Sequence, residues 1–247
     1  MVEQIEITTP DGTAEAYVAR PDGDVRGGVL FWMDAIGLRP RIADMVEEIA
    51  GWGYAVLAPN AFYRDGRAAD LAPKGDLREP EAREAFFASG ITERLNNLTP
   101  ERVAADVPCY GKALDAYAPG LKFGTTGYCM GARLAIRTAA LIPDRVVAVG
   151  GFHGGGLVTD EPTSPHTAIV PGAEYVFGHA DNDASMTPEH VAVLGKALDA
   201  AGATYTNEIY PDAPHGYSMS DTSMWHEPSF LRQRAELKAL LERRLIR

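Results

Sequence analysis

The sequence is poor in cysteine. Among its 247 residues only Cys109 and Cys129 carry a thiol. Two cysteines cannot build a disulfide scaffold, and they cannot supply a zinc site on their own. The question that they leave open is whether either of them is a reactive thiol.

Positive charge is also scarce. The 23 Lys and Arg residues face 34 Asp and Glu residues, which gives a formal net charge of −11. A nucleic-acid-binding protein presents a basic face to phosphates, and adhesion to anionic membranes requires basic residues as well. The charge balance therefore argues against nucleic-acid and membrane partners.

Long apolar runs are missing too. No stretch approaches the ~18–20 apolar residues of a membrane-spanning helix, and the acidic residues 1–6 do not lead into the apolar region of a signal peptide. We therefore expect a cytoplasmic protein whose thiols stay reduced. The hydrophobic fraction of 46% and the charged fraction of 23% are ordinary for a globular chain, so global disorder is excluded.

Strand and helix patterns alternate along the chain. Alternating residues at 3–8 and 13–19 flank a turn at 9–12 and predict a hairpin. The apolar runs that follow are typical of buried strands, and helical periodicity separates them. Strands are expected at 28–33, 54–58, 122–128, 146–150, 174–178 and 204–210, and helices at 39–52, 100–117, 130–141, 188–201 and 228–246. This order predicts an α/β fold with a mostly parallel central sheet, an antiparallel N-terminal edge, helices on both faces and no large separate cap domain.

Residues 60–98 depart from this pattern. They are charged, rich in Arg, contain several Pro and Gly, and show little periodicity apart from a short helix near 79–88. A long segment of this kind is either a functional lid or substrate loop, or a solvated excursion. The sequence favours neither, and we expect a single domain over residues 1–247 with an elaborated loop at about 60–98.

The strongest chemical signal is Gly-Tyr-Cys-Met-Gly at residues 127–131, where a predicted strand meets a predicted helix. The pattern Gly-x-nucleophile-x-Gly at such a junction indicates a nucleophile elbow, whose turn is too tight for a Cβ on the flanking residues. The N-terminus of the next helix favours a thiolate. We therefore predict Cys129 as the nucleophile; the alternative is a buried structural cysteine. Cys109, inside the predicted helix 100–117, is expected to fill the core.

A thiol nucleophile needs a base, and the base needs an orienting carboxylate. After such an elbow, both follow the nucleophile in the sequence. His215 lies in the loop after the last predicted strand and is the predicted base, with His179 as the alternative. The loop after strand 174–178 offers Asp181 and Asp183 as the acid, and periodicity does not choose between them.

The oxyanion hole needs two backbone N–H groups. One is expected from Met130 and the other from Ala35, in the loop after strand 28–33. Asp34 precedes Ala35, and its carboxylate would repel a developing negative charge unless it is paired. A helix-capping role is the alternative for Asp34.

These motifs resemble the dienelactone hydrolase family of α/β-hydrolases, over most of the chain. Residues 127–132 are similar to the family's G-Y-C-x-G-G/A elbow, residues 183–188 to its D-x-x-V-P motif, and residues 215–217 to its H-G/S-F motif. Residues 60–64 look like its D-L-Y-x-R stretch. The resemblance implies an α/β-hydrolase fold and favours Asp183 over Asp181 as the acid.

The resemblance also suggests substrate-binding residues. Asp34 stands where the family has a Glu that contacts the resting thiol and helps to generate the thiolate. Met219 stands where dienelactone-cleaving members have an Arg that binds the substrate carboxylate. Arg64, Arg83 and Arg133 are the candidates for recognising an anionic substrate, although a structural salt bridge is favoured for Arg133.

The predicted function is therefore hydrolysis of a small ester or lactone through a thioester on Cys129, with His215 oriented by Asp183. This chemistry requires no metal or organic cofactor, and we expect a monomer or a small homo-oligomer. Two alternatives remain at this point. One is a non-hydrolytic binding or sensor protein with the same fold, and the other is a thiol redox sensor.

Overall fold

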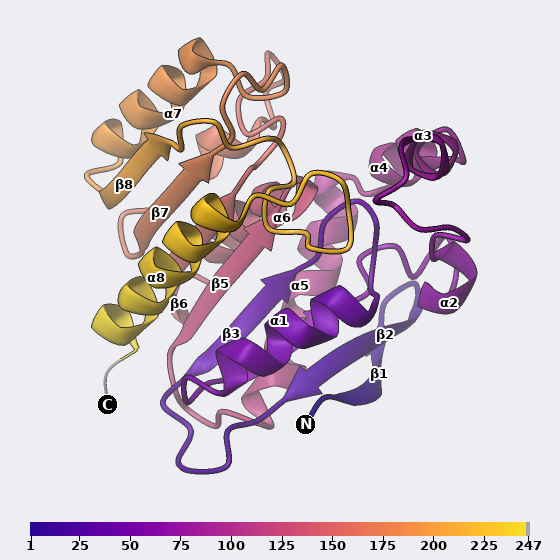
Figure 1. Ribbon diagram of the computed structural model, residues 1–247. Helices are drawn as coiled ribbons and strands as arrows, with labels where there is room; N and C mark the ends of the chain where they lie inside the picture. Colours follow the sequence, from indigo (N-terminus) through magenta and orange to yellow (C-terminus); the bar gives the residue numbers. More distant parts are fainter. Residues whose placement is uncertain (246–247) are drawn as a thin grey trace.

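The computed structural model describes residues 1–245, which form one eight-stranded sheet with helices on both faces (Figure 1). The strand order is β1-β2-β4-β3-β5-β6-β7-β8. The first two strands form the predicted antiparallel hairpin, β2 also pairs antiparallel with β4, and all other pairs are parallel. The strands are β1 (Glu3–Thr9), β2 (Gly12–Ala19), β3 (Gly28–Trp32), β4 (Ala55–Pro59), β5 (Phe123–Tyr128), β6 (Val146–Phe152), β7 (Glu174–His179) and β8 (Thr204–Ile209). The expected α/β architecture is confirmed.

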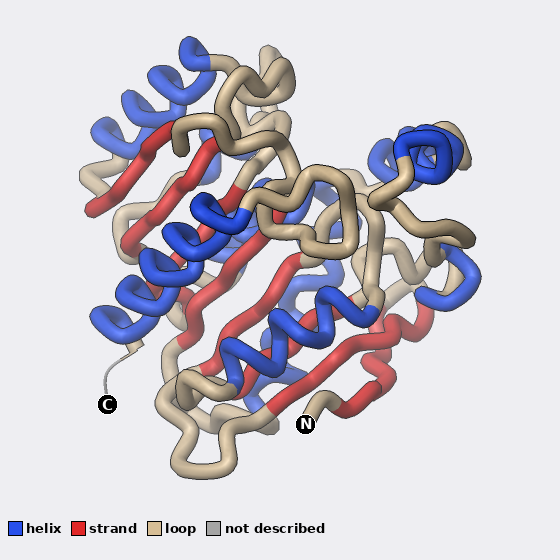
Figure 2. Tube along the Cα trace, in the orientation of Figure 1, coloured by secondary structure: helices blue, strands red, loops and turns tan. Residues whose placement is uncertain are grey.

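Helices cover both faces of the sheet (Figure 2). In Figure 1, α1 and α8 lie in front of the sheet, and α5 and α6 lie behind it. The long helices are α1 (Pro40–Ala50), α5 (Pro100–Asp115), α6 (Met130–Leu141), α7 (Pro188–Ala200) and α8 (Glu227–Arg244). A short 3₁₀ helix, η1 (Pro165–Ala168), packs against α6 and α7. Strands β3 and β4 are buried on both faces, so their sequences are apolar without alternation, whereas the edge strand β8 is only partly covered.

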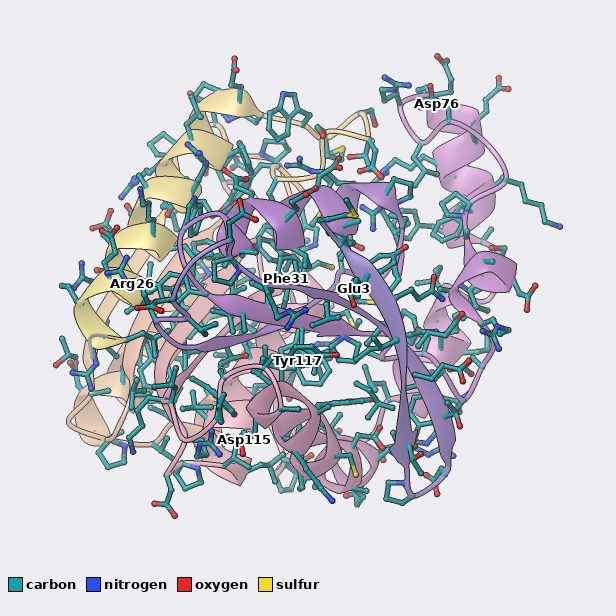
Figure 3. The ribbon with its side chains drawn as sticks, turned by 90° about the horizontal axis from the view of Figure 1, so that it is seen from below. Glu3, Arg26, Phe31, Asp76, Asp115 and Tyr117 are labelled. Atoms are coloured by element: carbon teal, nitrogen blue, oxygen red, sulfur yellow. The ribbon has the colours of Figure 1, made fainter. Side chains whose placement is uncertain are left out.

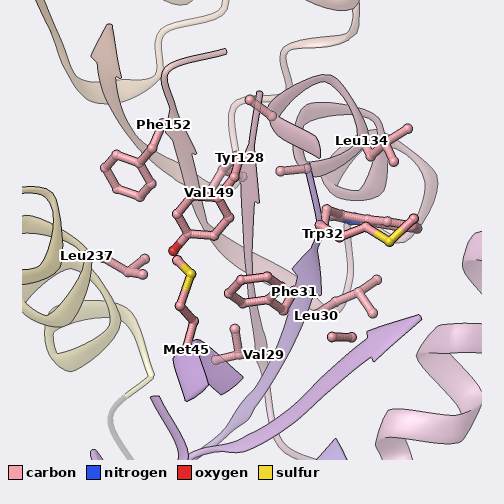
Figure 4. Packing of buried hydrophobic residues seen from close by; sticks show 14 of the residues in the cluster. Val29, Leu30, Phe31, Trp32, Met45, Tyr128, Leu134, Val149, Phe152 and Leu237 are labelled. Atoms are coloured by element: carbon pink, nitrogen blue, oxygen red, sulfur yellow. The ribbon is translucent and has the colours of Figure 1, made fainter. Parts of the chain in front are cut away.

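Strand β3 shows how this double burial works, because all five of its residues are buried. Successive side chains of a strand point to opposite faces. On one face, Phe31 stacks on Tyr128 with 4.9 Å between the ring centroids. On the other, the Trp32 Nε1–H donates a 2.9 Å hydrogen bond to Thr138 of α6 (Figure 4). The sheet therefore holds two apolar layers together.

The excursion at 60–98 contains three short helices, α2 (Ala68–Leu71), α3 (Pro80–Phe87) and α4 (Ile91–Asn97), where the sequence indicated one. Helices α3 and α4 project beside the sheet (Figure 1), and Asp76 marks the outer rim of this region in Figure 3. Each of these two helices buries only one side chain, Phe86 in α3 and Ile91 in α4. The short helix expected near residues 79–88 corresponds to α3, whereas α2 and α4 show too little apolar periodicity for the sequence to indicate them.

Two expectations about individual residues are wrong. Cys109 does not fill the core but lies half-buried at its edge. Arg64 is bound by two carboxylates, donating hydrogen bonds of 2.7 and 2.9 Å to Asp106 and one of 2.8 Å to Asp11. The Arg64 guanidinium therefore anchors the start of the excursion to α5 through structural ion pairs.

Replacing Arg64 by Ala leaves Asp106, whose side chain is 3% exposed, as an uncompensated buried carboxylate. We expect the free energy of unfolding to fall by about 3–5 kcal/mol, measured by urea denaturation. The matched control is Arg78→Ala, because the Arg78–Asp76 pair is exposed to solvent and should contribute little to the free energy of unfolding. Equal effects of the two substitutions would contradict this assignment.

Candidate active site

The nucleophile elbow lies at the carboxyl end of β5. Cys129 has φ 53° and ψ −118°, a conformation that non-glycine residues seldom adopt, and α6 begins at the next residue. A Cβ on Gly127 would lie 2.0 Å from the carbonyl oxygen of Gly131. A Cβ on Gly131 would lie 2.5 Å from the carbonyl oxygens of Trp32 and Met33. The two glycines therefore allow α6 to start directly against β3 and β5.

The loops after β7 and β8 bring Asp183 and His215 together, although 32 residues separate them. His215 Nδ1 and Asp183 Oδ2 are 2.6 Å apart. Asp183 also accepts hydrogen bonds from the backbone N–H and the hydroxyl of Ser185, and its side chain is only 5% exposed. Because Asp183 holds Nδ1, the imidazole presents Nε2 to Cys129, with which it interacts by hydrogen bonding and charge.

This arrangement shifts two pKa values in opposite directions. Burial alone would lower the pKa of His215, but the Cys129 sulfur and the Asp183 carboxylate outweigh burial and raise it to about 10. Burial alone would raise the pKa of Asp183, but His215 and Ser185 lower it to about 2. At neutral pH the pair is therefore an imidazolium and a carboxylate.

The residues that competed for these roles have other partners. His179 is buried and its Nε2 is 2.7 Å from the Asn207 amide oxygen. Asp181 accepts hydrogen bonds from the backbone N–H groups of Asn182 and Asp212, so it stabilises the loops. Tertiary contacts therefore bring Asp183 and His215 to the nucleophile, and not Asp181 or His179.

Asp34 forms a buried ion pair. Arg39 donates hydrogen bonds of 2.7 and 3.0 Å to its two carboxylate oxygens, and Arg39 also binds Asp221 at 2.5 Å. Within residues 1–245, no bond joins Asp34 to Cys129. Asp34 does not cap α1 either, since the N-cap residue is Arg39. Its Oδ1 accepts the N–H of Ile36, which fixes the turn that carries Ala35.

A small cleft of about 40 Å³ opens above the nucleophile and contains Cys129, His215 and Ala35 in its wall. Its other walls are largely apolar and include Ile36, Phe87, Met219 and Met224. Arg83 reaches this cleft from α3, with its guanidinium 5.0 Å from the centre of the Phe87 ring. Of the two candidate substrate arginines, Arg83 therefore lies at the cleft and Arg64 does not.

His153 is a cleft residue that the sequence analysis missed. It is buried, has φ 37°, and its ring packs edge-on against His215 at 5.5 Å. Its Nε2 is 2.6 Å from the Ser218 hydroxyl, and burial lowers its pKa well below the usual value. Its place directly after β6, at the carboxyl end of the sheet, was the only available signal.

The geometry supports acyl transfer. A half-buried thiol lies beside an imidazole that a carboxylate orients, and the Met130 N–H stands at the start of α6. Within residues 1–245, His, Cys, Asp and Glu side chains form no cluster of three or more that could hold a metal ion. None of the described helices is both long enough and apolar enough to span a membrane.

Comparisons with known proteins agree with this geometry. The model of the dienelactone hydrolase family matches residues 14–242. A Yersinia pestis protein provisionally named carboxymethylenebutenolidase is 28% identical, covering 91% of this chain and 82% of its own. Carboxymethylenebutenolidase 1 of Cupriavidus pinatubonensis is 27% identical over 72% of this chain and 71% of its own.

Solved structures share the fold. A Klebsiella pneumoniae protein provisionally named dienelactone hydrolase superposes with a TM-score of 0.78 at 22% identity, covering 98% of both chains. A carboxyl esterase from Bacillus coagulans gives a TM-score of 0.70 at 12% identity over 99% of both chains. With its α/β-hydrolase fold and the match over residues 14–242, this chain is a hydrolase of the dienelactone hydrolase family.

Proposed function

We propose that this protein hydrolyses a small carboxylic ester or lactone through a thioester on Cys129. The observation that carries the proposal is the 2.6 Å contact between His215 and Asp183 at the mouth of the elbow that presents Cys129. An oriented imidazole beside a thiol is the arrangement that activates a sulfur nucleophile. The family relationship supplies the substrate class, esters and lactones.

In the first half of the reaction, the Cys129 thiolate attacks the carbonyl carbon. The N–H groups of Met130 and Ala35 stabilise the oxyanion, at roughly 3–4 kcal/mol for each well-placed donor. When the tetrahedral intermediate collapses, the C–O bond breaks and the His215 imidazolium gives its proton to the leaving oxygen. The products of this half are an alcohol and a thioester.

In the second half, neutral His215 takes a proton from a water molecule, which attacks the thioester carbonyl. The C–S bond breaks, the carboxylic acid leaves, and the sulfur departs as the thiolate. The proton on His215 restores the imidazolium. The chain then returns to its starting state without any cofactor step.

Asp34 and Arg39 act in this scheme through position and charge. The ion pair neutralises the carboxylate beside the oxyanion donors, and the bond from Ile36 N–H to Asp34 holds the turn with Ala35 in place. Direct deprotonation of the thiol by Asp34 is not part of the proposal, because that carboxylate is already bound at both oxygens.

Replacing Cys129 by Ala should reduce hydrolysis of p-nitrophenyl acetate by at least about 10³-fold, because the nucleophile is lost. The matched control is Cys109→Ala, which removes the other thiol of the chain and should leave the rate unchanged. Mass spectrometry of rapidly quenched wild-type protein should show an acyl adduct on Cys129. Hydrolysis that survives in Cys129→Ala would contradict the proposal, and a wild-type protein without esterase activity would favour a binding or sensor role.

The pKa values predict the pH profile. For the wild type, kcat/KM for an alkyl ester should fall as the pH rises through about 10, because His215 then loses the proton that the leaving oxygen needs. Replacing Asp183 by Asn removes a negative charge that raises the pKa of His215, so the alkaline limb should move to lower pH. Asp183 itself stays ionised down to a pKa of about 2 and should add no limb above that pH. An identical alkaline limb in both proteins would argue against the assigned pair.

Replacing Arg39 by Gln leaves the Asp34 carboxylate, which is 5% exposed, unpaired beside the oxyanion donors. We expect kcat/KM to fall by about 10- to 100-fold, and the double variant Asp34→Asn/Arg39→Gln to recover part of this loss. Melting temperatures measured in parallel separate this effect from unfolding. If the double variant is as poor as the single one, Arg39 acts in some way other than by neutralising Asp34.

A further inference from the structure

A second, larger cleft begins beside the nucleophile. It encloses about 340 Å³, and Met130, Arg133 and Arg137 of α6 form one wall. The segment from the end of α4 to the start of α5 and the loop after β6 form the others. We call it the arginine cleft. The cleft above Cys129 is bounded instead by the turn after β3, by α3 and by the loop around His215, so the two open on different sides of the elbow.

Arg133 and Arg137 lie one turn apart on the face of α6 that lines this cleft. Helical side chains lean toward the helix N-terminus, and residues four apart share a face. Arg133 is the fourth residue after Cys129 and interacts with it electrostatically. Arg137 lies one helical turn after Arg133. On the facing wall, a Cβ on Gly156 would lie 3.8 Å from the Arg133 side chain, and one on Gly155 would lie 3.5 Å from His215. The backbone of Gly155 and Gly156 therefore runs from the His215 side chain to the Arg133 side chain.

The positive charge in this cleft is not neutralised. Within residues 1–245, the Arg133 guanidinium makes no ion pair and no hydrogen bond, so the structural salt bridge that the sequence suggested is absent. Arg137 donates a hydrogen bond to the Thr163 carbonyl oxygen and feels Glu101 only through longer-range charge. Exposed Glu161 lines the same cleft.

Such an arrangement is costly without a ligand. Burial lowers the pKa of Arg133, and its interaction with Cys129 offsets this effect only in part. A planar guanidinium matches a carboxylate, with which it can form two parallel hydrogen bonds. In a chain of net charge −11, an anionic substrate depends on local cations of this kind.

We propose that the arginine cleft binds a carboxylate carried by the alcohol portion of the substrate. The inference rests on the proposed hydrolysis at Cys129. The leaving oxygen must lie beside His215 to receive its proton, and the Gly155–Gly156 loop leads from His215 to Arg133. The small apolar cleft then receives the acyl group. Because the two ends of the substrate occupy different clefts, the preferred substrate is an open-chain ester with a short acyl group, and not a small lactone that joins both ends in one ring.

Two acetate esters of nearly equal size test this proposal, one of meta-hydroxybenzoate and one of meta-hydroxybenzamide. They share the acyl group and differ in the charge of the alcohol. The measured quantity is kcat/KM for the anionic ester divided by kcat/KM for the neutral ester. This ratio should fall about 10-fold or more in Arg133→Gln. It should fall less in Arg133→Lys, because that variant keeps the positive charge. An unchanged ratio in Arg133→Gln would overturn the proposal.

The matched control is Arg20→Gln, which removes the same charge at the opposite edge of the sheet. Arg20 follows the end of β2, which pairs with the start of β4, and it forms a weak, exposed ion pair with Glu3. This variant should leave the ratio unchanged. A similar fall in Arg20→Gln would assign the effect to net charge alone and would also overturn the proposal.

A binding measurement separates this inference from the proposed function. In the Cys129→Ala background, calorimetry should show that free meta-hydroxybenzoate binds about 10-fold more weakly when Arg133→Gln is added, but not when Arg20→Gln is added. If binding weakens in this way but the wild type cleaves neither ester, the proposed carboxylate site in the arginine cleft stands and the proposed hydrolysis at Cys129 is refuted. Equal binding in both double variants, or no binding in Cys129→Ala, would refute the cleft.

Discussion

A Cβ on Gly127 would sit 2.0 Å from the carbonyl oxygen of Gly131, and a Cβ on Gly131 would meet the backbone after β3. This close approach of three backbones holds Cys129 at φ 53° and fixes its sulfur at the edge of the sheet. Because β3, β5 and α6 meet there, the backbones of Ala35 and Met130, which are the proposed oxyanion donors, are brought to the same place. The loops after β7 and β8 need only reach the same edge, where parallel strands end together.

Around Cys129, positive and negative side chains are paired locally, although the chain as a whole carries a net charge of −11. Arg39 joins Asp34 to Asp221, and His215 joins Asp183 to the sulfur, so each buried cation stands between two acidic groups. A carboxylate beside an oxyanion hole is tolerable because its charge is cancelled locally. Among residues 1–245, Arg133 departs from this pattern because it has no ion-pair partner, and the proposed selection of anionic substrates rests on this observation.

The regular part of the fold was predictable because each strand and helix repeats its pattern often enough. The apolar run ending in Phe31 and Trp32 shows double burial, and α6 and α8 begin within a residue of their expected positions. Within the excursion the sequence indicated α3 but not α2 or α4, since α2 buries no side chain and α4 buries only Ile91. The half-buried position of Cys109 and the ion pairs of Arg64 depend on contacts between distant segments, which local patterns do not encode.

The sequence by itself determined the elbow, because the requirement for glycine at 127 and 131 is steric and local. It also narrowed the base and the acid to a few residues on the correct loops. Only the tertiary structure decided that His215 contacts Asp183, that Asp34 pairs with Arg39, and that Arg133 has no ion-pair partner among residues 1–245. The physical reason is that a strand or a turn is specified by neighbours in sequence, whereas a partner for a charge is specified by whichever segments the sheet brings to the same edge.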